Sequence, residues 1–328
     1  SRVGAVRKET GHMIGTEFIK GVIPAVVTPM KADGQLDEQG LRRLIDHLIE
    51  QQVHGIFTIG TAGEFWALTV DEKRQVFDWT VDQVQGRVPV YLGTCAGTTT
   101  EAVQLARDAE KAGADALSVL TPLFIAPDEE EMYQHYRAIA EAVELPVLLY
   151  TNPDRTGNDL SPALVERLAT EVDHIAGIKD SSGNLSQTVE YLRRTPDDFR
   201  VLMGRDTLIY AAMVHGAAGA IAASANLAPD LSVGIYERFI AGDLKGALAF
   251  QLRLAPLRNA FSLGTFPAML KTGLELLGLP AGPPRAPVSP LTGEARERLR
   301  SALAQAGKVE AMFAPTQDAV DDENLEPA

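Results

Sequence analysis

The sequence predicts an α/β protein, a (β/α)8 TIM barrel followed by a C-terminal helical extension. Short apolar stretches typical of buried strands alternate with amphipathic stretches typical of helices, and the alternation repeats eight times. Eight βα units in a chain of about this length are characteristic of the barrel. The competing doubly wound sheet would need a glycine-rich phosphate turn after its first strand, and residues 28–34 do not provide one.

The strands are expected where apolar runs are bounded by turn residues. They fall at residues 21–27, 55–59, 88–93, 116–120, 145–150, 175–179, 200–203 and 219–222. Between them, residues 37–49, 99–112 and 129–143 carry apolar side chains at helical spacing, and the first of these stretches has an acidic first turn. Gly113 would end the helix over 99–112, because glycine is common just after a helix C-terminus.

The residues after the eighth strand exceed what a barrel needs. We expect the barrel over 17–230 and a helical extension over 231–309. The helices of the extension are expected at 231–240, 244–261, 266–277 and 293–306. Residues 1–16 are aperiodic and predicted to be disordered or derived from a tag, and residues 310–328 are predicted to form an acidic disordered tail.

Composition limits the partners and the compartment. The formal net charge of −14 argues against nucleic acid and against anionic membrane surfaces, since both repel an acidic protein. A single cysteine, Cys95, excludes internal disulfides and suits a reducing compartment. No apolar run is long enough to cross a bilayer, and the N-terminal residues do not resemble a signal peptide. We therefore expect a cytoplasmic protein.

Lys179 is the first candidate for chemistry. It closes the apolar strand over 175–179 just before a Ser-Ser-Gly turn. Burial disfavours the charged ammonium and leaves a neutral amine, which can attack a ketone to form a Schiff base. The alternative is a lysine that reaches solvent from the end of the strand, so Lys179 needs support from other residues.

That support comes from the residues that follow other strands, because the C-terminal ends of barrel strands meet at one mouth. Tyr150 can transfer protons to and from a substrate oxygen. The turn over 60–63 offers backbone N–H groups and the Thr61 hydroxyl to a carboxylate, and Arg155 could bind a second anionic group. Each feature alone has a structural explanation, namely packing, a turn or an exposed loop. Their joint occurrence at strand ends favours an active site.

Four motifs carry a resemblance to a known family. They are Gly60-Thr-Ala-Gly-Glu64 with Thr69-Val-Asp-Glu72 after it, Leu149-Tyr150, Arg155-Thr-Gly157 and Gly177-Ile-Lys-Asp180. In combination they resemble the dihydrodipicolinate synthase/N-acetylneuraminate lyase superfamily of class I pyruvate aldolases, over residues 21–309. The resemblance implies a barrel with a helical extension that assembles as a homotetramer, a dimer of dimers. It also implies small-molecule substrates, a 2-oxo acid and an aldehyde.

The resemblance assigns roles to individual residues. Lys179 would form the imine with pyruvate or another 2-oxo acid, so that no organic cofactor is needed, and Tyr150 would shuttle protons. Thr61 would hold the carboxylate, and Arg155 would orient the second substrate. The remaining assigned positions are the carboxylate turn at Gly60, Ala62 and Gly63, the Ile221 carbonyl facing the 2-oxo acid, and Phe124 at a subunit interface near the site.

Two departures from the family pattern bear on the substrate. Ala62 stands where a second hydroxyl is common, and Phe124 stands where a neighbouring subunit of dihydrodipicolinate synthase supplies a tyrosine to a proton relay. Residues 63–65, 157–162 and 223–229 look closer to aldolases and dehydratases of 2-oxo-3-deoxy sugar acids. We therefore expect a Schiff-base lyase that cleaves or condenses carbon–carbon bonds of pyruvate or such a sugar acid. Dihydrodipicolinate synthase, a 2-oxo acid dehydratase and a non-catalytic ligand-binding barrel remain the alternatives.

Other site chemistries have less support. The six histidines lack ligand spacing, so no metal is expected, and Cys95 is interpreted as a small apolar filler. Apolar residues near the expected mouth either make an apolar entrance or pack between subunits. These residues are Phe65, Trp66, Leu123 and Phe124.

Overall fold

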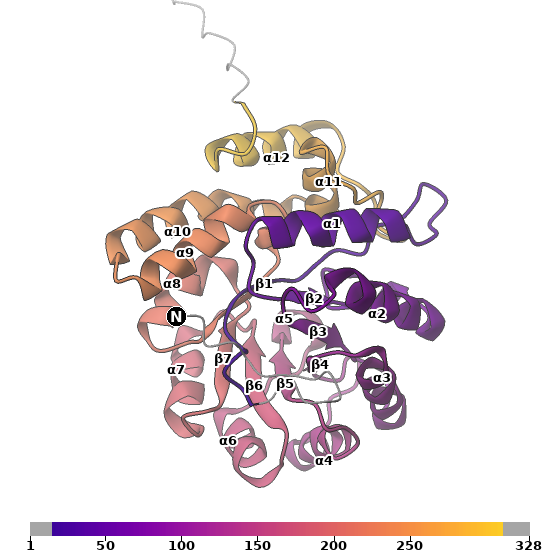
Figure 1. Cartoon of the computed structure of the whole chain (residues 1–328), viewed down its shortest axis with the longest axis vertical. Coiled ribbons are helices and arrows are strands. Elements are labelled where there is room, and N and C mark those ends of the chain that lie inside the picture. Colours follow the sequence, from indigo (N-terminus) through magenta and orange to yellow (C-terminus); the bar gives the residue numbers. More distant parts are fainter. Residues whose placement is uncertain (1–14, 311–328) are drawn as a thin grey trace, which may run out of the picture.

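The computed structural model describes residues 15–310 and confirms the expected barrel, with parallel strands surrounded by helices (Figure 1). The eight strands follow the order β1-β8-β7-β6-β5-β4-β3-β2. A single bridge between Ala25 and Phe57 joins the two outer members of this order. The segments predicted to be disordered, 1–16 and 310–328, lie almost wholly outside the described residues.

The strand bounds agree with the expected ones to within three residues. They are β1 Gly21–Pro24, β2 Ile56–Thr58, β3 Val90–Gly93, β4 Ala116–Leu120, β5 Val147–Thr151, β6 Ile175–Asp180, β7 Arg200–Met203 and β8 Gly219–Ala222. The largest difference is at residues 25–27, which were expected to continue β1. Their backbone N–H groups bond to three different partners, Ala222, Phe57 and the Asn226 side chain, so they do not continue one ladder.

The first and last strands of the chain, β1 and β8, pair at a point where two glycines face each other. Gly219 lies opposite Gly21 in the register. A Cβ atom on Gly219 would lie 2.1 Å from the Gly21 carbonyl oxygen, and the φ angle of Gly219 is +147°, which few side chains tolerate. The first and last strands can therefore approach closely enough to hydrogen-bond.

Helices follow the strands as expected, and several begin at residues that cap them. Asp37 accepts from the Gly40 N–H at the start of the first helix, and Gly113, with φ +99°, ends the third. The helix expected over 129–143 ends at Ala140. The helices of the barrel are α1 Glu38–Glu50, α2 Val70–Val84, α3 Thr99–Ala112, α4 Glu129–Ala140, α5 Pro153–Thr156, α6 Pro162–Glu171, α7 Leu185–Arg194 and α8 Ile209–Val214, with short 3₁₀ turns η1 Phe65–Ala67, η2 Asp206–Leu208 and η3 Ser224–Asn226.

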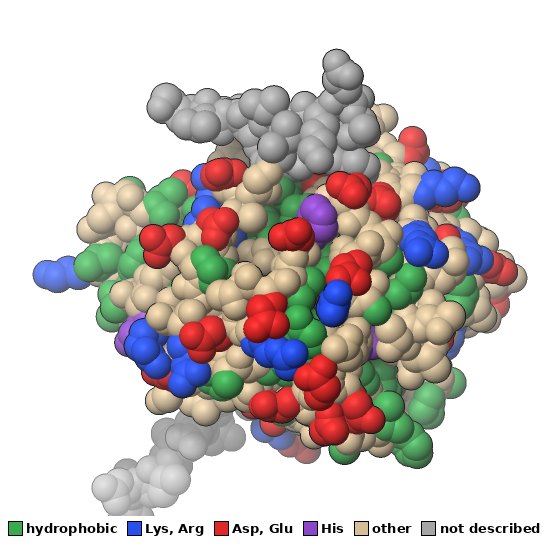
Figure 2. Space-filling model, turned by 90° about the horizontal axis from the view of Figure 1, so that it is seen from below, with side chains coloured by type: hydrophobic (Ala, Val, Ile, Leu, Met, Phe, Trp, Pro, Cys, Tyr) green, Lys and Arg blue, Asp and Glu red, His purple; other side chains and the backbone are tan. Residues whose placement is uncertain are grey.

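The C-terminal extension covers one side of the barrel next to α1 (Figure 1). Its helices are α9 Pro229–Ile240, α10 Leu244–Asn259, α11 Ala268–Leu276 and α12 Gly293–Gln305, with a 3₁₀ turn η4 Ala260–Leu263. The helix expected over 244–261 thus ends two residues early and continues as a 3₁₀ turn. Acidic and basic side chains lie interspersed on the face seen in Figure 2. Between residues 15 and 310, none of the helices combines the length and apolarity needed for a membrane span.

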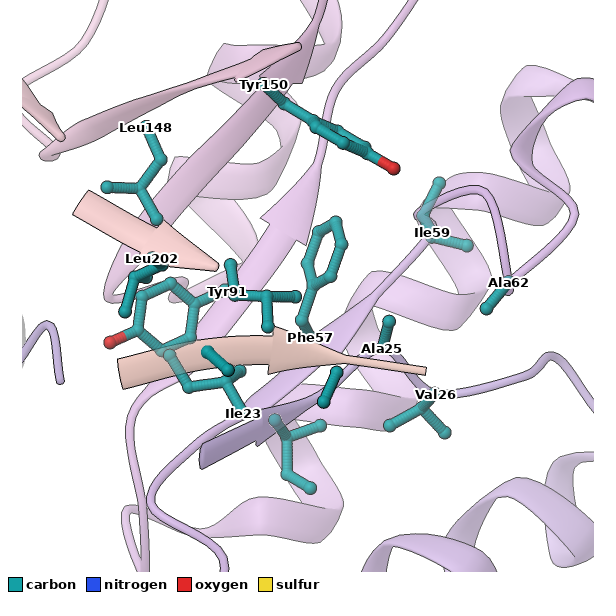
Figure 3. Packing of buried hydrophobic residues seen from close by; sticks show 14 of the residues in the cluster. Ile23, Ala25, Val26, Phe57, Ile59, Ala62, Tyr91, Leu148, Tyr150 and Leu202 are labelled. Carbon is teal, nitrogen blue, oxygen red and sulfur yellow. The ribbon is translucent and has the colours of Figure 1, made fainter. Parts of the chain in front are cut away.

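The barrel interior is filled by large apolar side chains that alternate along the strands. Ile23, Phe57, Tyr91, Leu148 and Leu202 are all buried and lie together in the interior (Figure 3). Strand neighbours of these residues point the other way, toward the helices, because side chains alternate along a strand. The filled interior makes the barrel a rigid base for the side chains at its C-terminal end.

Candidate active site

A cavity of about 180 Å³ lies at the C-terminal ends of the strands. A cavity of this size suits a small ligand. Of the residues singled out from the sequence, the cavity is lined by Thr61, Ala62, Tyr150, Arg155, Lys179 and Ile221. Sequence reasoning did not assign a role to the other lining residues, which are Ala25, Asn152, Asp154, Ser181, Gly204, Arg205, Asp206, Ala223, Arg258, Phe261 and Phe266.

Lys179 points into the barrel from β6, where it lies opposite Tyr150 of β5 and Leu202 of β7. The residue is only 3% exposed, so it does not reach freely into solvent. Its Nζ atom lies 4.0 Å from the centre of the Tyr150 ring and 4.8 Å from that of Phe57. The next residue, Asp180, points outward and accepts from the Thr188 hydroxyl at 2.6 Å. Strand alternation thus directs the amine inward to the cavity.

Tyr150 presents its phenol to the same cavity. Its hydroxyl lies 3.2 Å from the Thr61 hydroxyl and accepts from the Asn152 amide at 3.2 Å. In Figure 3 the phenol oxygen points toward the loop that carries Ala62. Burial by itself raises the pKa of Tyr150, but the Lys179 charge and hydrogen bonds from Thr61, Asn152 and Ser181 outweigh it and lower the pKa. Tyr150 is therefore a stronger acid than an ordinary tyrosine and is hydrogen-bonded to a second hydroxyl.

The backbone is strained at Ile59, between the end of β2 and the loop over 60–63. Ile59, a β-branched residue, has φ +57°, which is rare for such a side chain. Its carbonyl fits only because Gly93 has no side chain, since a Cβ there would lie 2.2 Å from the Ile59 oxygen. Within residues 15–310, neither the Thr61 nor the Ala62 N–H donates to another backbone or side-chain group. Two N–H groups beside the cavity are thus available to a carboxylate.

Glu64, the last residue of the Gly-Thr-Ala-Gly-Glu motif, links this loop to the extension through an ion pair and a hydrogen bond. Its side chain is fully buried and forms an ion pair with Lys271 of α11, with 2.5 Å between Oε1 and Nζ. The other carboxylate oxygen accepts from the Arg285 N–H at 2.8 Å, and Lys271 also donates to the Pro283 carbonyl at 3.0 Å. Burial lowers the pKa of Lys271, and the Glu64 carboxylate opposes that shift.

Three arginines stand at the mouth of the cavity. Arg205 forms an ion pair with Asp154 at 3.0 Å. The Arg155 guanidinium carbon lies 5.4 Å from the centre of the Phe266 ring, and that of Arg258 lies 4.5 Å from the centre of Phe261. Arg258, Phe261 and Phe266 come from the extension, where no motif or strand end draws attention to them. Sequence reasoning therefore missed this wall of the site.

The residues considered for an apolar mouth do not line the cavity. Phe124 is fully exposed, and Trp66 is 40% exposed. Phe65 is buried and Leu123 half-buried. Of the two alternatives left open for these side chains, the apolar entrance receives no support from the cavity lining, and packing between subunits stays a prediction. The role of Phe124 at a subunit interface stays a prediction.

Cys95 is buried, in agreement with its interpretation as a filler. Burial raises its pKa to about 12, so the thiolate is scarce at neutral pH. We expect the folded protein to resist alkylation by iodoacetamide at pH 7.5. After unfolding in guanidinium it should gain a single alkyl group, as measured by intact mass. Alkylation of the folded protein within minutes would contradict this environment.

In the described part of the chain, no group of three or more His, Cys, Asp or Glu side chains has an arrangement suitable for a metal ion. The polar side chains around the cavity instead combine an amine, a phenol, hydroxyls and guanidinium groups. This arrangement can form a covalent bond to a carbonyl carbon and hold anionic groups on either side of it.

Comparison with known proteins identifies one family over nearly the whole chain. Residues 18–306 match the model of the dihydrodipicolinate synthetase family. The 4-hydroxy-tetrahydrodipicolinate synthase of Methanopyrus kandleri is 40% identical over 290 residues, covering 88% of this chain and 97% of that protein. The same-named protein of Archaeoglobus fulgidus is 40% identical over 286 residues, covering 87% and 98%.

Solved structures of this family superimpose on most of the chain. A prophage protein from E. coli K12, YagE, described as belonging to the dihydrodipicolinic acid synthase family and solved in complex with pyruvate, superimposes with a TM-score of 0.86 at 34% identity. The match covers 88% of this chain and 99% of that one. Dihydrodipicolinate synthase from Thermotoga maritima superimposes with a TM-score of 0.86 at 31% identity, over 88% and 99% of the two chains.

Proposed function

Because the chain belongs to the dihydrodipicolinate synthetase family and is a lyase of the Schiff-base aldolase type, we propose that Lys179 forms an imine with pyruvate or a 2-oxo-3-deoxy sugar acid. The observation that carries this proposal is the buried Lys179 amine, 4.0 Å from the ring of a tyrosine whose hydroxyl is hydrogen-bonded to Thr61. A pyruvate complex of the related prophage protein supports the choice of pyruvate.

The imine forms in two steps that these residues can serve. The lone pair of the Lys179 nitrogen adds to the ketone carbon, and the electron pair of the carbonyl π bond moves to oxygen, which takes a proton from Tyr150. The nitrogen then loses a proton, the oxygen gains one and leaves as water, and an iminium remains. The substrate carboxylate is held by the Thr61 hydroxyl and the N–H groups of Thr61 and Ala62, with the Ile221 carbonyl facing the 2-oxo acid. Gly60 and Gly63, which do not line the cavity, shape the turn that carries these groups.

Carbon–carbon chemistry follows from the iminium. Its positive nitrogen accepts electrons, so the neighbouring carbon can lose a proton to give an enamine, which attacks the carbon of an aldehyde. Cleavage of a 2-oxo-3-deoxy sugar acid is the same step in reverse. The imine nitrogen serves as the electron sink in both directions, so the proposed chemistry uses no organic cofactor and no metal.

Tyr150→Phe should lower the turnover number by about 10²-fold or more, because a positioned acid–base group contributes about 10²–10⁴-fold. Steady-state kinetics with pyruvate as a substrate or product would measure the loss. Tyr91→Phe is the matched control, since Tyr91 is buried in the barrel interior and does not line the cavity. Equal activity of the two variants would remove Tyr150 from the mechanism.

The direct test of the proposal is trapping. The protein is incubated with pyruvate and sodium borohydride, and its intact mass and peptide map are recorded. We expect one reduced pyruvyl group, on Lys179. If pyruvate gives no adduct, the same trap with a 2-oxo-3-deoxy sugar acid follows, and absence of both adducts would refute the imine.

Synthesis of 4-hydroxy-tetrahydrodipicolinate is the second candidate, because relatives at 40% identity carry that name. Arg155 at the mouth supports it, whereas Phe124 lacks the hydroxyl of the relay described above. The two candidate functions are separated by comparing two kcat/KM values. One is measured for the condensation of pyruvate with aspartate semialdehyde, and the other for the cleavage of a 2-oxo-3-deoxy sugar acid.

We further propose a cytoplasmic homotetramer, a dimer of dimers, in which Phe124 meets a neighbouring subunit. The fully exposed Phe124 ring and the 54% exposed Ile125 beside it support this contact, since large apolar side chains at a loop tip gain by being covered. Sedimentation equilibrium of the wild type and of Phe124→Asp tests it. An unchanged mass in the variant would exclude Phe124 from the interface.

A further inference from the structure

The carboxylate loop over 60–63 lies between two residues whose backbone is in the left-handed region. Ile59 has φ +57° and Glu64 has φ +56°, although neither is glycine. This conformation is unfavourable for residues that carry a side chain, so it persists only where the surrounding structure enforces it. At the Ile59 end, the space beside Gly93 admits the Ile59 carbonyl, as described above. The Glu64 end requires a constraint of its own.

The helical extension supplies that constraint through the Glu64 side chain. One carboxylate oxygen of Glu64 forms the 2.5 Å ion pair with Lys271, and the other accepts from the backbone N–H of Arg285 at 2.8 Å. Lys271 is itself held, because it also donates to the Pro283 carbonyl at 3.0 Å. Both oxygens of a fully buried carboxylate are therefore bound by groups from the extension, and the direction of the side chain is fixed.

Further hydrogen bonds hold the loop and the turn that follows it. The Arg285 guanidinium donates to the Ala67 carbonyl at 2.7 Å and to both carboxylate oxygens of Glu72 at 2.8 Å. From the barrel, the Thr28 hydroxyl donates to the Gly63 carbonyl at 2.7 Å. The extension thus holds the chain at the end of the loop and again just beyond it, while the barrel holds the loop itself.

Stability alone does not explain a charged pair at this position. Replacing a buried ion pair by apolar side chains of similar volume often leaves a protein equally stable or more stable, because two charges lose their hydration on burial. An apolar pair would fill the same space, but it would not fix the direction of one side chain through hydrogen bonds. Neither Glu64 nor Lys271 lines the cavity. Any effect of the pair on a substrate therefore passes through the loop.

We propose that Lys271 and Arg285 are positioning residues, which act through Glu64 to hold the loop over 60–63 in the conformation that binds a carboxylate. This inference rests on the proposed function, in which the backbone N–H groups of this loop bind the carboxylate of a 2-oxo acid. The extension prepares the loop before the ligand arrives, so that binding does not have to order it. The charged pair thus belongs to the carboxylate site, although it lies outside the cavity.

Pyruvate and methyl pyruvate test this proposal, because they present the same ketone and only pyruvate has an anionic carboxylate. Trapping with sodium cyanoborohydride over a concentration series gives the half-saturating concentration of each ligand. In Lys271→Met we expect this concentration to rise by about tenfold or more for pyruvate, the size of effect that loss of a charged hydrogen bond allows, and to change little for methyl pyruvate. Arg285→Gln should show a smaller rise, because its backbone N–H still donates to Glu64.

Two control variants separate positioning from general destabilisation. Leu105→Ala removes a fully buried side chain of α3 that does not line the cavity, and it should lose a similar amount of stability while binding pyruvate as the wild type does. Glu64→Gln/Lys271→Met should regain part of the stability of Lys271→Met but keep the weakened binding of pyruvate, because the ion pair is absent. If pyruvate binding instead follows the Tm across all these variants, the positioning role is refuted.

The two proposals can fail separately. Unchanged half-saturation by pyruvate in Lys271→Met, with the adduct still on Lys179, overturns the positioning role and leaves the imine intact. If the wild type forms no adduct with either ligand, the imine proposal fails, and the increase in Tm caused by pyruvate tests the positioning role. An increase in the wild type that is lost in Lys271→Met supports it, whereas equal increases in the two proteins, or none in the wild type, overturn it.

Discussion

Lys179→Ala will reduce turnover to below about one-thousandth of the wild-type rate and will abolish the borohydride-trapped adduct. The variant lacks the proposed nucleophile and with it the covalent route, and losses of several orders of magnitude are typical of nucleophile variants. The residue is 3% exposed and surrounded by aromatic rings, so the cavity offers the substrate no equivalent amine in its place. Steady-state kinetics and intact mass measure the two losses separately.

A second variant distinguishes a nucleophile from a simple positive charge. Lys179→Arg keeps the charge but remains protonated, so it cannot attack a ketone. We expect it to be as inactive as Lys179→Ala. Lys245→Ala, an exposed lysine of α10, should behave as the wild type. Substantial turnover by Lys179→Arg would mean that charge is sufficient, and the Schiff-base mechanism would fall.

Lys271→Met will lower the free energy of unfolding by about 3–5 kcal/mol, the usual range when one partner of a buried ion pair is removed. Glu64 and Lys271 are 0% and 1% exposed, so the remaining carboxylate would be left in the interior without its cation. Chemical denaturation monitored by circular dichroism gives the change. Glu64→Gln/Lys271→Met should recover part of the loss, because it leaves no unpaired charge.

The matched control is an ion pair at the surface. Arg296 and Glu275 form a pair at 3.1 Å with side chains 30% and 64% exposed. Arg296→Met should cost at most about 1 kcal/mol, because water screens such pairs. A loss of this small size in Lys271→Met as well would contradict the stabilising role of the buried pair.

The parts of the site that lie on strands could be predicted from the sequence. Lys179, Tyr150 and Thr61 follow short apolar runs, and the C-terminal ends of barrel strands meet at one mouth, so their proximity followed from the order of elements. The structure brings Tyr150 and Thr61 to within 3.2 Å of each other and sets Lys179 against the Tyr150 ring. The spacing of the strands along the sequence is therefore enough to predict that these three residues lie close together.

The parts supplied by helices could not be predicted in that way. Arg258 precedes the end of α10 by one residue. The helical pattern there shows which positions are buried and which are exposed, but it does not show which loop of the barrel a side chain contacts. Glu64 and Lys271 lie 207 positions apart, and nothing in the local sequence links them. Residues 25–27 were mistaken for a strand because an apolar run looks the same whether its N–H groups share one partner strand or three.

The wall of the cavity is divided between the barrel and the extension, so both parts contribute side chains to one site. A chimera that joins residues 17–230 to the extension of a relative would exchange Arg258, Phe261 and Phe266 while keeping Lys179 and Tyr150. Such a hybrid would keep the residues of the proposed covalent step and acquire the donor's side chains on the part of the cavity wall that the extension supplies. We therefore expect the substrate preference of the hybrid to follow the extension, without any substitution among the strands.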